Sequence, residues 1–114
     1  MPYIKTTTNV EISDEKRLNL QKKLGQAIAL IPGKTESWLM LAFEDKISMA
    51  FKGNSDAPFA FADVSIFGKA SDAAYDRLTA AICEIFSEEL GVPQANTYVK
   101  YEESDHWGWN GSNF

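Results

Sequence analysis

Apolar residues along the chain fall into runs that predict five short strands. Residues 3–10, YIKTTTNV, are rich in β-branched side chains, which suit a pleated backbone. Residues 36–45, ESWLMLAFED, hold the near-continuous apolar run Trp38–Phe43, which is typical of a strand covered on both faces. Further strands are expected at residues 47–51 (ISMAF), 58–67 (PFAFADVSIF) and 96–103 (NTYVKYEE).

Two other segments, residues 15–31 and 73–90, place apolar side chains at mostly helical spacing. Ser13 and Ser71 are the candidate N-caps, each followed by an aspartate that suits the positive end of a helix dipole. The first helix is expected to end at Pro32-Gly33 and the second at the segment GVPQ, residues 91–94.

The order strand–helix–strand therefore occurs twice, with nearly the same internal spacing. Ser13 and Ser71 stand 58 residues apart, while Trp38 and Tyr98 stand 60 residues apart. A helix that crosses back over a sheet makes the two strands that it joins parallel. Two such βαβ units side by side predict an α+β fold in a single domain over residues 1–114. This fold has a four-stranded mixed sheet and two helices on one face.

The second face of that sheet is left bare by the two helices. Because the Trp38–Phe43 run is too apolar to lie against water, we expect copies of the same chain to cover this face. Closed rotational symmetry is the usual arrangement of such copies. The aromatic tail SDHWGWNGSNF is expected to fold onto a sheet edge or a neighbouring subunit, with Trp107 and Trp109 partly buried.

The composition of the chain limits the classes of partner that it is expected to bind. The formal net charge is −5, which nucleic-acid phosphates and anionic membrane surfaces would repel, so neither is an expected partner. The one cysteine, Cys83, cannot form an internal disulfide. No apolar run approaches the length of about 20 residues that a membrane span needs, and no signal peptide precedes the first strand. A cytoplasmic protein is therefore expected, with export by a signal-independent route left open.

Neither metal nor nucleotide motifs are present. The chain has a single histidine, His106, and no Cys/His cluster, so no metal site is expected. The segment GKAS lacks the spacing of a P-loop, and no GxGxxG occurs. The expected chemistry is therefore one that needs no cofactor.

A set of short motifs runs the whole length of the chain. In order, they are MPYIKTTTNV, GK before WLMLAF, MAFKG with Pro58 downstream, IFGK before the second helix, TYVKYEE, and GWNGSNF. Together these motifs resemble the tautomerase superfamily, and within it the macrophage migration inhibitory factor family of phenylpyruvate and dopachrome tautomerases.

The resemblance implies a homotrimer with active sites at the subunit boundaries. In that family the initiator methionine is removed and the newly terminal proline nitrogen, here that of Pro2, is the catalytic base. The family's lysine falls on Lys34, and its backbone contact falls on Phe67. Its tyrosine from a neighbouring subunit falls on Tyr98, and its tail tryptophan on Trp109.

A free amine at Pro2 would suit keto–enol chemistry. An α-amino group titrates at about 7.7–8.0, and an apolar cavity lowers that pKa, so the amine can accept a proton near neutral pH. Lys34 would anchor a substrate carboxylate and lower the amine pKa further, while Tyr3, Tyr98 and Trp109 would line a flat slot. The expected activity is cofactor-independent tautomerisation of a phenylpyruvate-like α-keto acid.

The sequence departs from the family pattern at two places. The Cys-x-x-Cys pair of the cytokine falls on Phe59 and Ala62, so a thiol-oxidoreductase activity tied to it is absent. The asparagine that accompanies the tyrosine is Lys100 here. A second cation there would strengthen carboxylate binding and favour doubly charged acids, or else it points to solvent.

Other interpretations stay open at this point. Pro2 alone would be a tolerated first residue of an edge strand, and Lys34 alone a charge that complements a helix C-terminus. The chain could instead be a receptor-binding signalling protein in which the tautomerase site is secondary. A decarboxylase or dehalogenase on the same fold would need an arginine near Pro2, whereas Arg17 and Arg77 lie on the two predicted helices.

Overall fold

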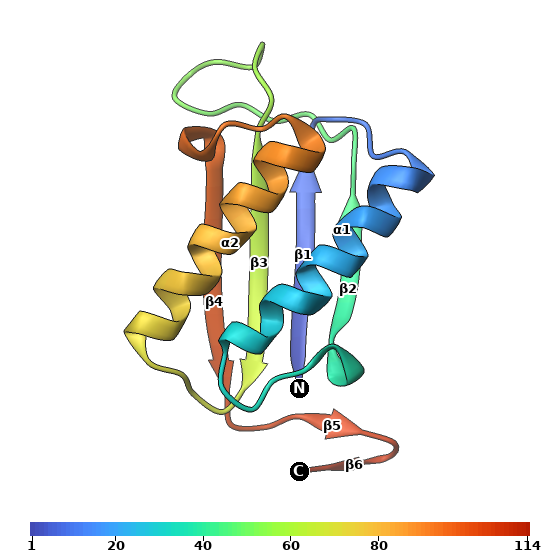
Figure 1. Cartoon of the computed structure of the whole chain (residues 1–114), viewed down its shortest axis with the longest axis vertical. Coiled ribbons are helices and arrows are strands. Elements are labelled where there is room, and N and C mark those ends of the chain that lie inside the picture. Colours follow the sequence, from blue (N-terminus) through green and yellow to red (C-terminus); the bar gives the residue numbers. More distant parts are fainter.

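The structure is a computed structural model that describes all residues 1–114. Its main elements are two helices and six strands, joined by short 3₁₀ turns (Figure 1). In chain order they are β1 (Pro2–Thr8), α1 (Asp14–Ala27), β2 (Met40–Glu44), β3 (Ala60–Phe67), α2 (Asp72–Leu90), β4 (Thr97–Ser104), β5 (Gly108–Trp109) and β6 (Ser112–Asn113).

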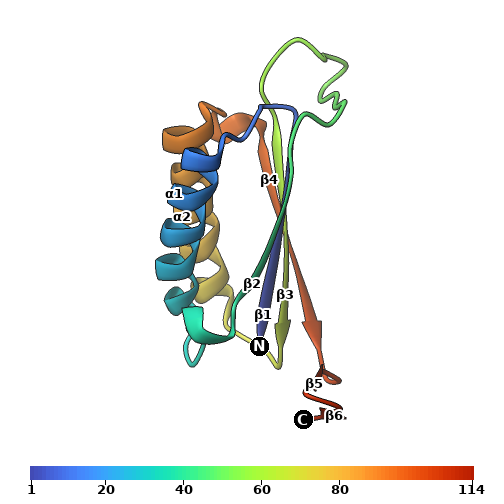
Figure 2. The same ribbon diagram turned by 90° about the vertical axis from the view of Figure 1, so that its right-hand side faces the viewer.

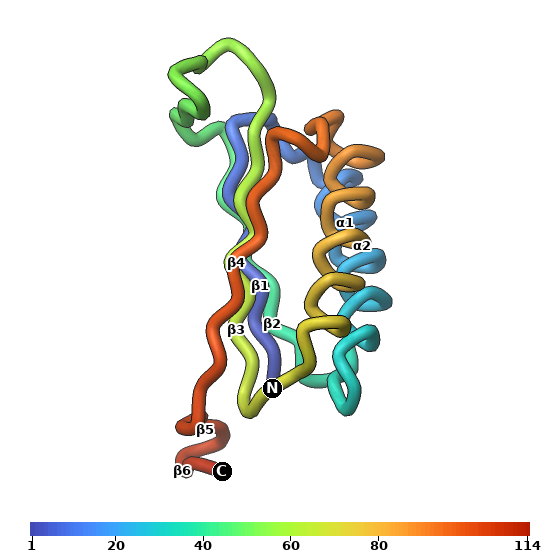
Figure 3. Tube along the Cα trace, turned by 90° about the vertical axis from the view of Figure 1, so that its left-hand side faces the viewer, coloured from blue at the N-terminus to red at the C-terminus, as the bar shows by residue number.

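The first four strands form a mixed sheet in the order β2-β1-β3-β4. Strand β1 runs parallel to β2 and β3 runs parallel to β4, while β1 and β3 are antiparallel. Both helices lie on one face of this sheet, as Figures 2 and 3 show. The predicted α+β fold with two βαβ units is confirmed.

The helix ends follow the sequence closely at three of four places. The Ser13 hydroxyl accepts a hydrogen bond from the Lys16 N–H, and the Ser71 hydroxyl accepts one from the Ala74 N–H. Gly91 ends α2 in the left-handed conformation, at φ 67°. Only the end of α1 differs, because the α-helix stops at Ala27 and a 3₁₀ turn continues it to Leu30.

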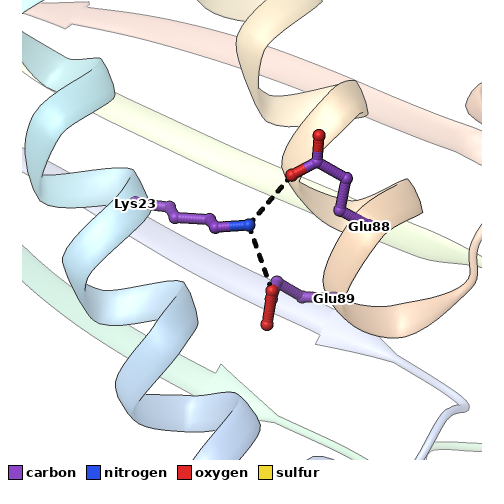
Figure 4. Close-up of polar contacts among 3 residues, drawn as sticks. All are labelled: Lys23, Glu88 and Glu89. Carbon is purple, nitrogen blue, oxygen red and sulfur yellow. Dashed lines mark hydrogen bonds and ion pairs between the residues drawn. The ribbon is translucent and has the colours of Figure 1, made fainter.

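The hydrophobic core fills the space between the helices and the sheet. Alternate residues of β1 and β3 are buried there, as expected for a half-covered sheet. The largest fully buried side chains include Ile4, Ile66, Leu20, Leu24, Leu78, Ile82 and Phe86. At the outer surface of this layer, the Lys23 ammonium of α1 pairs with Glu88 at 2.9 Å and Glu89 at 3.1 Å on α2 (Figure 4).

One strand prediction was wrong, and another holds only in part. Residues 47–51 form no strand, and Phe51 makes only an isolated bridge with Asn54 in the loop that projects beyond the sheet (Figures 2 and 3). Only Ile47, at its start, bonds to the sheet, through its N–H and the Thr8 carbonyl oxygen at 3.0 Å, and no ladder continues from there. The run Trp38–Phe43 is a strand only in part, because Trp38 belongs to a 3₁₀ turn and β2 begins at Met40, which is 67% exposed in the single chain.

The helix-free face of the sheet carries three rows of side chains, defined by the strand register. The end row is Met40, Tyr3, Ser65 and Glu102; the middle row is Ala42, Lys5, Asp63 and Lys100; the far row is Glu44, Thr7, Phe61 and Tyr98.

Charged side chains are interspersed along this face, so it is less apolar than the run 38–43 indicated. Lys5 pairs with Glu44 at 2.9 Å, and Lys100 pairs with Asp63 at 3.5 Å and Glu102 at 3.1 Å. The expectation rested on the run 38–43. Three apolar members of that run, Leu39, Leu41 and Phe43, pack instead against the core on the helix side.

Candidate functional site

Pro2 is the first residue of the central strand β1 and is buried. It lies opposite Ile66 in the antiparallel ladder with β3, so it does not begin an edge strand. The Met1 carbonyl oxygen accepts a hydrogen bond from the Phe67 N–H at 3.0 Å. The start of the chain is therefore held in the sheet rather than left as a frayed end.

Lys34 lies beside this N-terminus, on the loop that follows α1. Its ammonium donates a hydrogen bond to the Phe67 carbonyl oxygen at 2.7 Å and takes part in none of the ion pairs. Partial burial lowers the pKa of the N-terminal amine below its ordinary value of 8.0, and the charge of Lys34 and a hydrogen bond with it lower this pKa further. The structure therefore brings three predicted site residues, Pro2, Lys34 and Phe67, to one end of the sheet.

A cavity opens next to Pro2 at this end. It is lined by the whole end row, including Tyr3, and by side chains of the turn 37–39 and of the tail. All three tryptophans of the chain contribute to the aromatic part of the wall. Its polar part comes from serine, glutamate and histidine side chains: Ser37, Ser65, Glu102, Glu103, Ser104 and His106. The cavity thus combines an aromatic wall with a buried strand terminus.

The C-terminal tail folds back over the same end of its own sheet as a small hairpin of β5 and β6 (Figure 1). The Trp109 ring meets the edge of Trp38 at a centroid distance of 5.0 Å and stacks on Phe114 at 6.3 Å. Phe114 also lies 5.8 Å from Phe67. The expectation that the tail packs against the molecule is met within one chain, although Trp109 stays 52% exposed.

Trp38 and Phe114 were missed as site residues by sequence reasoning. Trp38 was assigned to a strand, and the structure instead places it four residues after Lys34 at the cavity wall. Its nearness to Lys34 in sequence was the available signal. Phe114 reaches the site through the Phe67 and Trp109 contacts, which join distant parts of the chain and leave no local pattern.

Tyr98 lies away from Pro2 of the same chain. Its ring contacts Phe51 at 4.9 Å and Phe61 at 6.4 Å in the far row. Phe61 and Ile66, the partner of Pro2, are five residues apart on β3, which corresponds to about 17 Å along the strand. One chain therefore does not bring Tyr98 and Pro2 together.

Lys100 occupies the middle row between these two ends. Its pKa is raised, first by the hydrogen bond with Glu102 and then by the charges of Asp63 and Glu102. Lys100 is therefore an ion-paired residue of the helix-free face, and it does not line the cavity.

The remaining titratable groups have structural partners or lie elsewhere. Glu103 accepts hydrogen bonds from the Tyr75 hydroxyl at 2.7 Å and the Ala70 N–H at 3.3 Å. Burial, and then this contact with Glu103, raises the pKa of Tyr75 to about 12. Arg17 and Arg77 lie on α1 and α2, away from the lining of the cavity. No three His, Cys, Asp or Glu side chains are grouped so that they could hold a metal ion, and neither helix has the length and apolarity to cross a membrane.

Known proteins of one family match this chain over its whole length. The family model described as macrophage migration inhibitory factor (MIF) matches residues 1–114. The macrophage migration inhibitory factor of Xenopus laevis is 28% identical over 119 residues, spanning 100% of this chain and 99% of that protein.

Two solved structures extend this agreement to the fold. Leishmania major MIF2 has 35% sequence identity and a TM-score of 0.93, over 100% of this chain and 97% of that chain. The macrophage migration inhibitory factor homologue from Prochlorococcus marinus has 25% identity and a TM-score of 0.87, over 98% of each chain.

Proposed function

Because the chain belongs to the macrophage migration inhibitory factor family, we propose that it is a cofactor-independent keto–enol tautomerase. In this proposal Met1 is removed, the nitrogen of Pro2 is the general base, and the substrates are phenylpyruvate-like α-keto acids. The observation that carries the proposal is the position of the N-terminus, which lies at a buried strand start beside Lys34 and an aromatic cavity.

The proposed base draws its properties from this environment. Burial and the charge of Lys34 lower the pKa of the N-terminal amine. Removal of Met1 would leave a secondary amine on Pro2 near the same Lys34 ammonium, whose charge would likewise favour the neutral amine. The hydrogen-bonded start of β1 keeps this nitrogen in a fixed place, which favours proton transfer to and from a bound substrate.

The reaction moves one proton and leaves the oxidation state of the substrate unchanged. The Pro2 nitrogen takes a proton from the carbon next to the keto group, and the electron pair of the broken C–H bond forms the enol double bond. The keto oxygen gains a proton, and the proton on Pro2 is then released. Acid–base groups are sufficient for each of these transfers.

Lys34 is proposed as the anchor for the substrate carboxylate. Its ammonium has three N–H donors, and one of them is used by the Phe67 carbonyl oxygen. The remaining donors can bind a carboxylate beside Pro2. Tyr3 and Trp109 line the cavity and would hold the flat aryl group of the substrate.

The full site is proposed to need a neighbouring copy of the chain. Tyr98 and Lys100 are further substrate-binding candidates, and both lie on the helix-free face beyond the end row. A homotrimer in which the far end of one sheet meets the Pro2 end of the next would add them to the site. The exposed ring of Tyr98, 58% accessible in the single chain, supports this arrangement.

Receptor binding is the second candidate function, and family membership is the observation that favours it. The two candidates respond differently to a change at Pro2. A receptor-binding role that is separate from the site would persist in a Pro2→Gly variant, whereas the tautomerase role would not.

The test is the rate of phenylpyruvate ketonisation in the wild type and in Pro2→Gly, followed by the loss of enol absorbance. Loss of a general base lowers kcat/KM by at least about 100-fold. Glu84→Gln, a change at an exposed position of α2 that does not line the cavity, is the control and is expected to keep the wild-type rate. Undiminished turnover in Pro2→Gly, or Met1 still present by mass spectrometry in active protein, would contradict the proposal.

A further inference from the structure

The charged groups around the cavity are unequally distributed. Lys34 is the one cation beside Pro2 that pairs with no carboxylate. The charged side chains that line the cavity wall are instead the two carboxylates Glu102 and Glu103. Lys34 therefore supplies one unpaired positive charge beside the Pro2 end of the cavity, outside its lining, and the two carboxylates supply negative charge along one side.

The Glu103 carboxylate forms its hydrogen bonds within the protein, on the side of α2. It accepts hydrogen bonds from the Tyr75 hydroxyl and the Ala70 N–H, and these bonds keep it ionised by lowering its pKa. Glu102 faces the other way, in the end row beside Ser65 and Tyr3. Of the two carboxylates, Glu102 is thus the one that lies on the helix-free face, where it lines the cavity and pairs with Lys100.

The positive partner of Glu102 is shared. Lys100 lies 3.1 Å from Glu102 and 3.5 Å from Asp63, so one ammonium serves two carboxylates. Lys5, the next cation in the middle row, already pairs with Glu44 at 2.9 Å. The group of Asp63, Lys100 and Glu102 keeps one excess negative charge, and Lys100 is not a free anchor for a second acid group.

We propose that Glu102 is a specificity-determining residue that makes the site select keto acids with one carboxylate and an uncharged aryl group. This inference rests on the proposed function and names its substrate class. With the first carboxylate on Lys34, the rest of the substrate lies between the end row and the indoles of Trp38 and Trp109. A second carboxylate on the ring would meet the Glu102 carboxylate, and like charges at such short range repel each other.

Binding of inert analogues tests this selection without any turnover. The ligands are phenylpropanoate, with one carboxylate, and its para-carboxylated derivative, with two. All three tryptophans line the cavity, so quenching of their fluorescence reports binding directly.

In the wild type the Kd of the dianion is expected to exceed that of the monoanion by about tenfold, and added salt is expected to reduce this ratio. Glu102→Gln is expected to reduce the ratio several-fold, and Lys100→Gln to increase it. Glu84→Gln removes the same charge from an exposed position on α2 and is expected to leave the ratio unchanged.

The possible results separate the role of Glu102 in selection from the proposed tautomerase activity. A wild type that prefers the dianion, a ratio that Glu102→Gln leaves unchanged, or a failure of both analogues to bind overturns the role of Glu102. If the ratios behave as expected but no variant ketonises phenylpyruvate, the selection stands and the proposed activity fails. If phenylpyruvate is turned over and the ratio is unaffected by Glu102→Gln, the activity stands and the selection fails.

Discussion

Lys34 influences the site in two separable ways, through its charge and through its hydrogen bond. The charge lowers the pKa of the neighbouring amine, and the hydrogen bond to the Phe67 carbonyl oxygen fixes the position of the ammonium. A single substitution therefore changes both the binding of a carboxylate and the protonation state of the base. These two effects appear in different kinetic parameters.

Lys34→Gln is expected to raise the KM for phenylpyruvate by about 10- to 100-fold, since a charged hydrogen bond to the carboxylate is lost. It is also expected to move the rise of kcat/KM to higher pH. The base acts when unprotonated, and its pKa rises once the like charge of Lys34 is gone. Lys34→Arg keeps the charge and serves as the control, with a pH profile close to that of the wild type. A Lys34→Gln profile that moves to lower pH would contradict this role.

At the scale of elements, the sequence predicted those structures that depend on local patterns. The caps at Ser13 and Ser71 and the two βαβ units are set by residues close in the chain, and the structure has them as expected. Residues 47–51 have a strand-like pattern but bond to a strand only at Ile47, so pattern alone was not enough. In the candidate site, too, some features follow from local sequence patterns and others do not. Lys34 and Phe67 lie beside Pro2 because the segments that carry them meet at the same end of the sheet. The Trp38–Trp109 contact depends instead on how the tail folds back.

The contact between the two helices gives a prediction about stability. Lys23 of α1 bridges Glu88 and Glu89 of α2 (Figure 4), and the Glu89 side chain is only 12% exposed. The hydrogen bond from Lys23 is the main cause that lowers the pKa of Glu89 below 4.5. A carboxylate with a lowered pKa stabilises the fold above its unfolded pKa, and this stabilisation is lost as the pH falls through the folded value.

Lys23→Gln is therefore expected to lower the Tm at neutral pH by about 1–3 °C, as for a mainly surface pair. The difference from the wild type should disappear in acid, below the ordinary glutamate pKa of 4.5, where the carboxylates are protonated. Thermal unfolding followed by circular dichroism measures both. Lys22→Gln removes the same charge from an exposed neighbouring position that has no ion pair. If Lys22→Gln lowers the Tm equally, the decrease arises from the change in net charge and not from the loss of the ion pairs of Lys23.

At the scale of the whole molecule, the two candidate parts of the site lie at opposite ends of one sheet. Pro2 and Lys34 mark one end, and Tyr98 with Phe51 and Phe61 marks the other. A separation of about 17 Å along β3 cannot be closed within a chain whose strands are fully hydrogen-bonded. In the proposed homotrimer, a head-to-tail contact between copies would join the two ends, and a rotation that closes the contact into a ring would give each site one end from each of two copies.

This arrangement predicts that two defective chains restore activity when mixed. Pro2→Gly keeps Tyr98, and Tyr98→Ala keeps Pro2, so a site between one copy of each variant can contain both intact residues. Random assembly of a trimer from equal amounts gives such sites at about a quarter of all positions. The variants are unfolded together, refolded together and assayed for phenylpyruvate ketonisation, with each variant refolded alone as the control. Size-exclusion chromatography establishes that every sample has the same oligomeric state. Activity near a quarter of the wild-type value supports a shared site. Activity no higher than the average of the two variants alone would mean that Tyr98 serves no neighbouring Pro2.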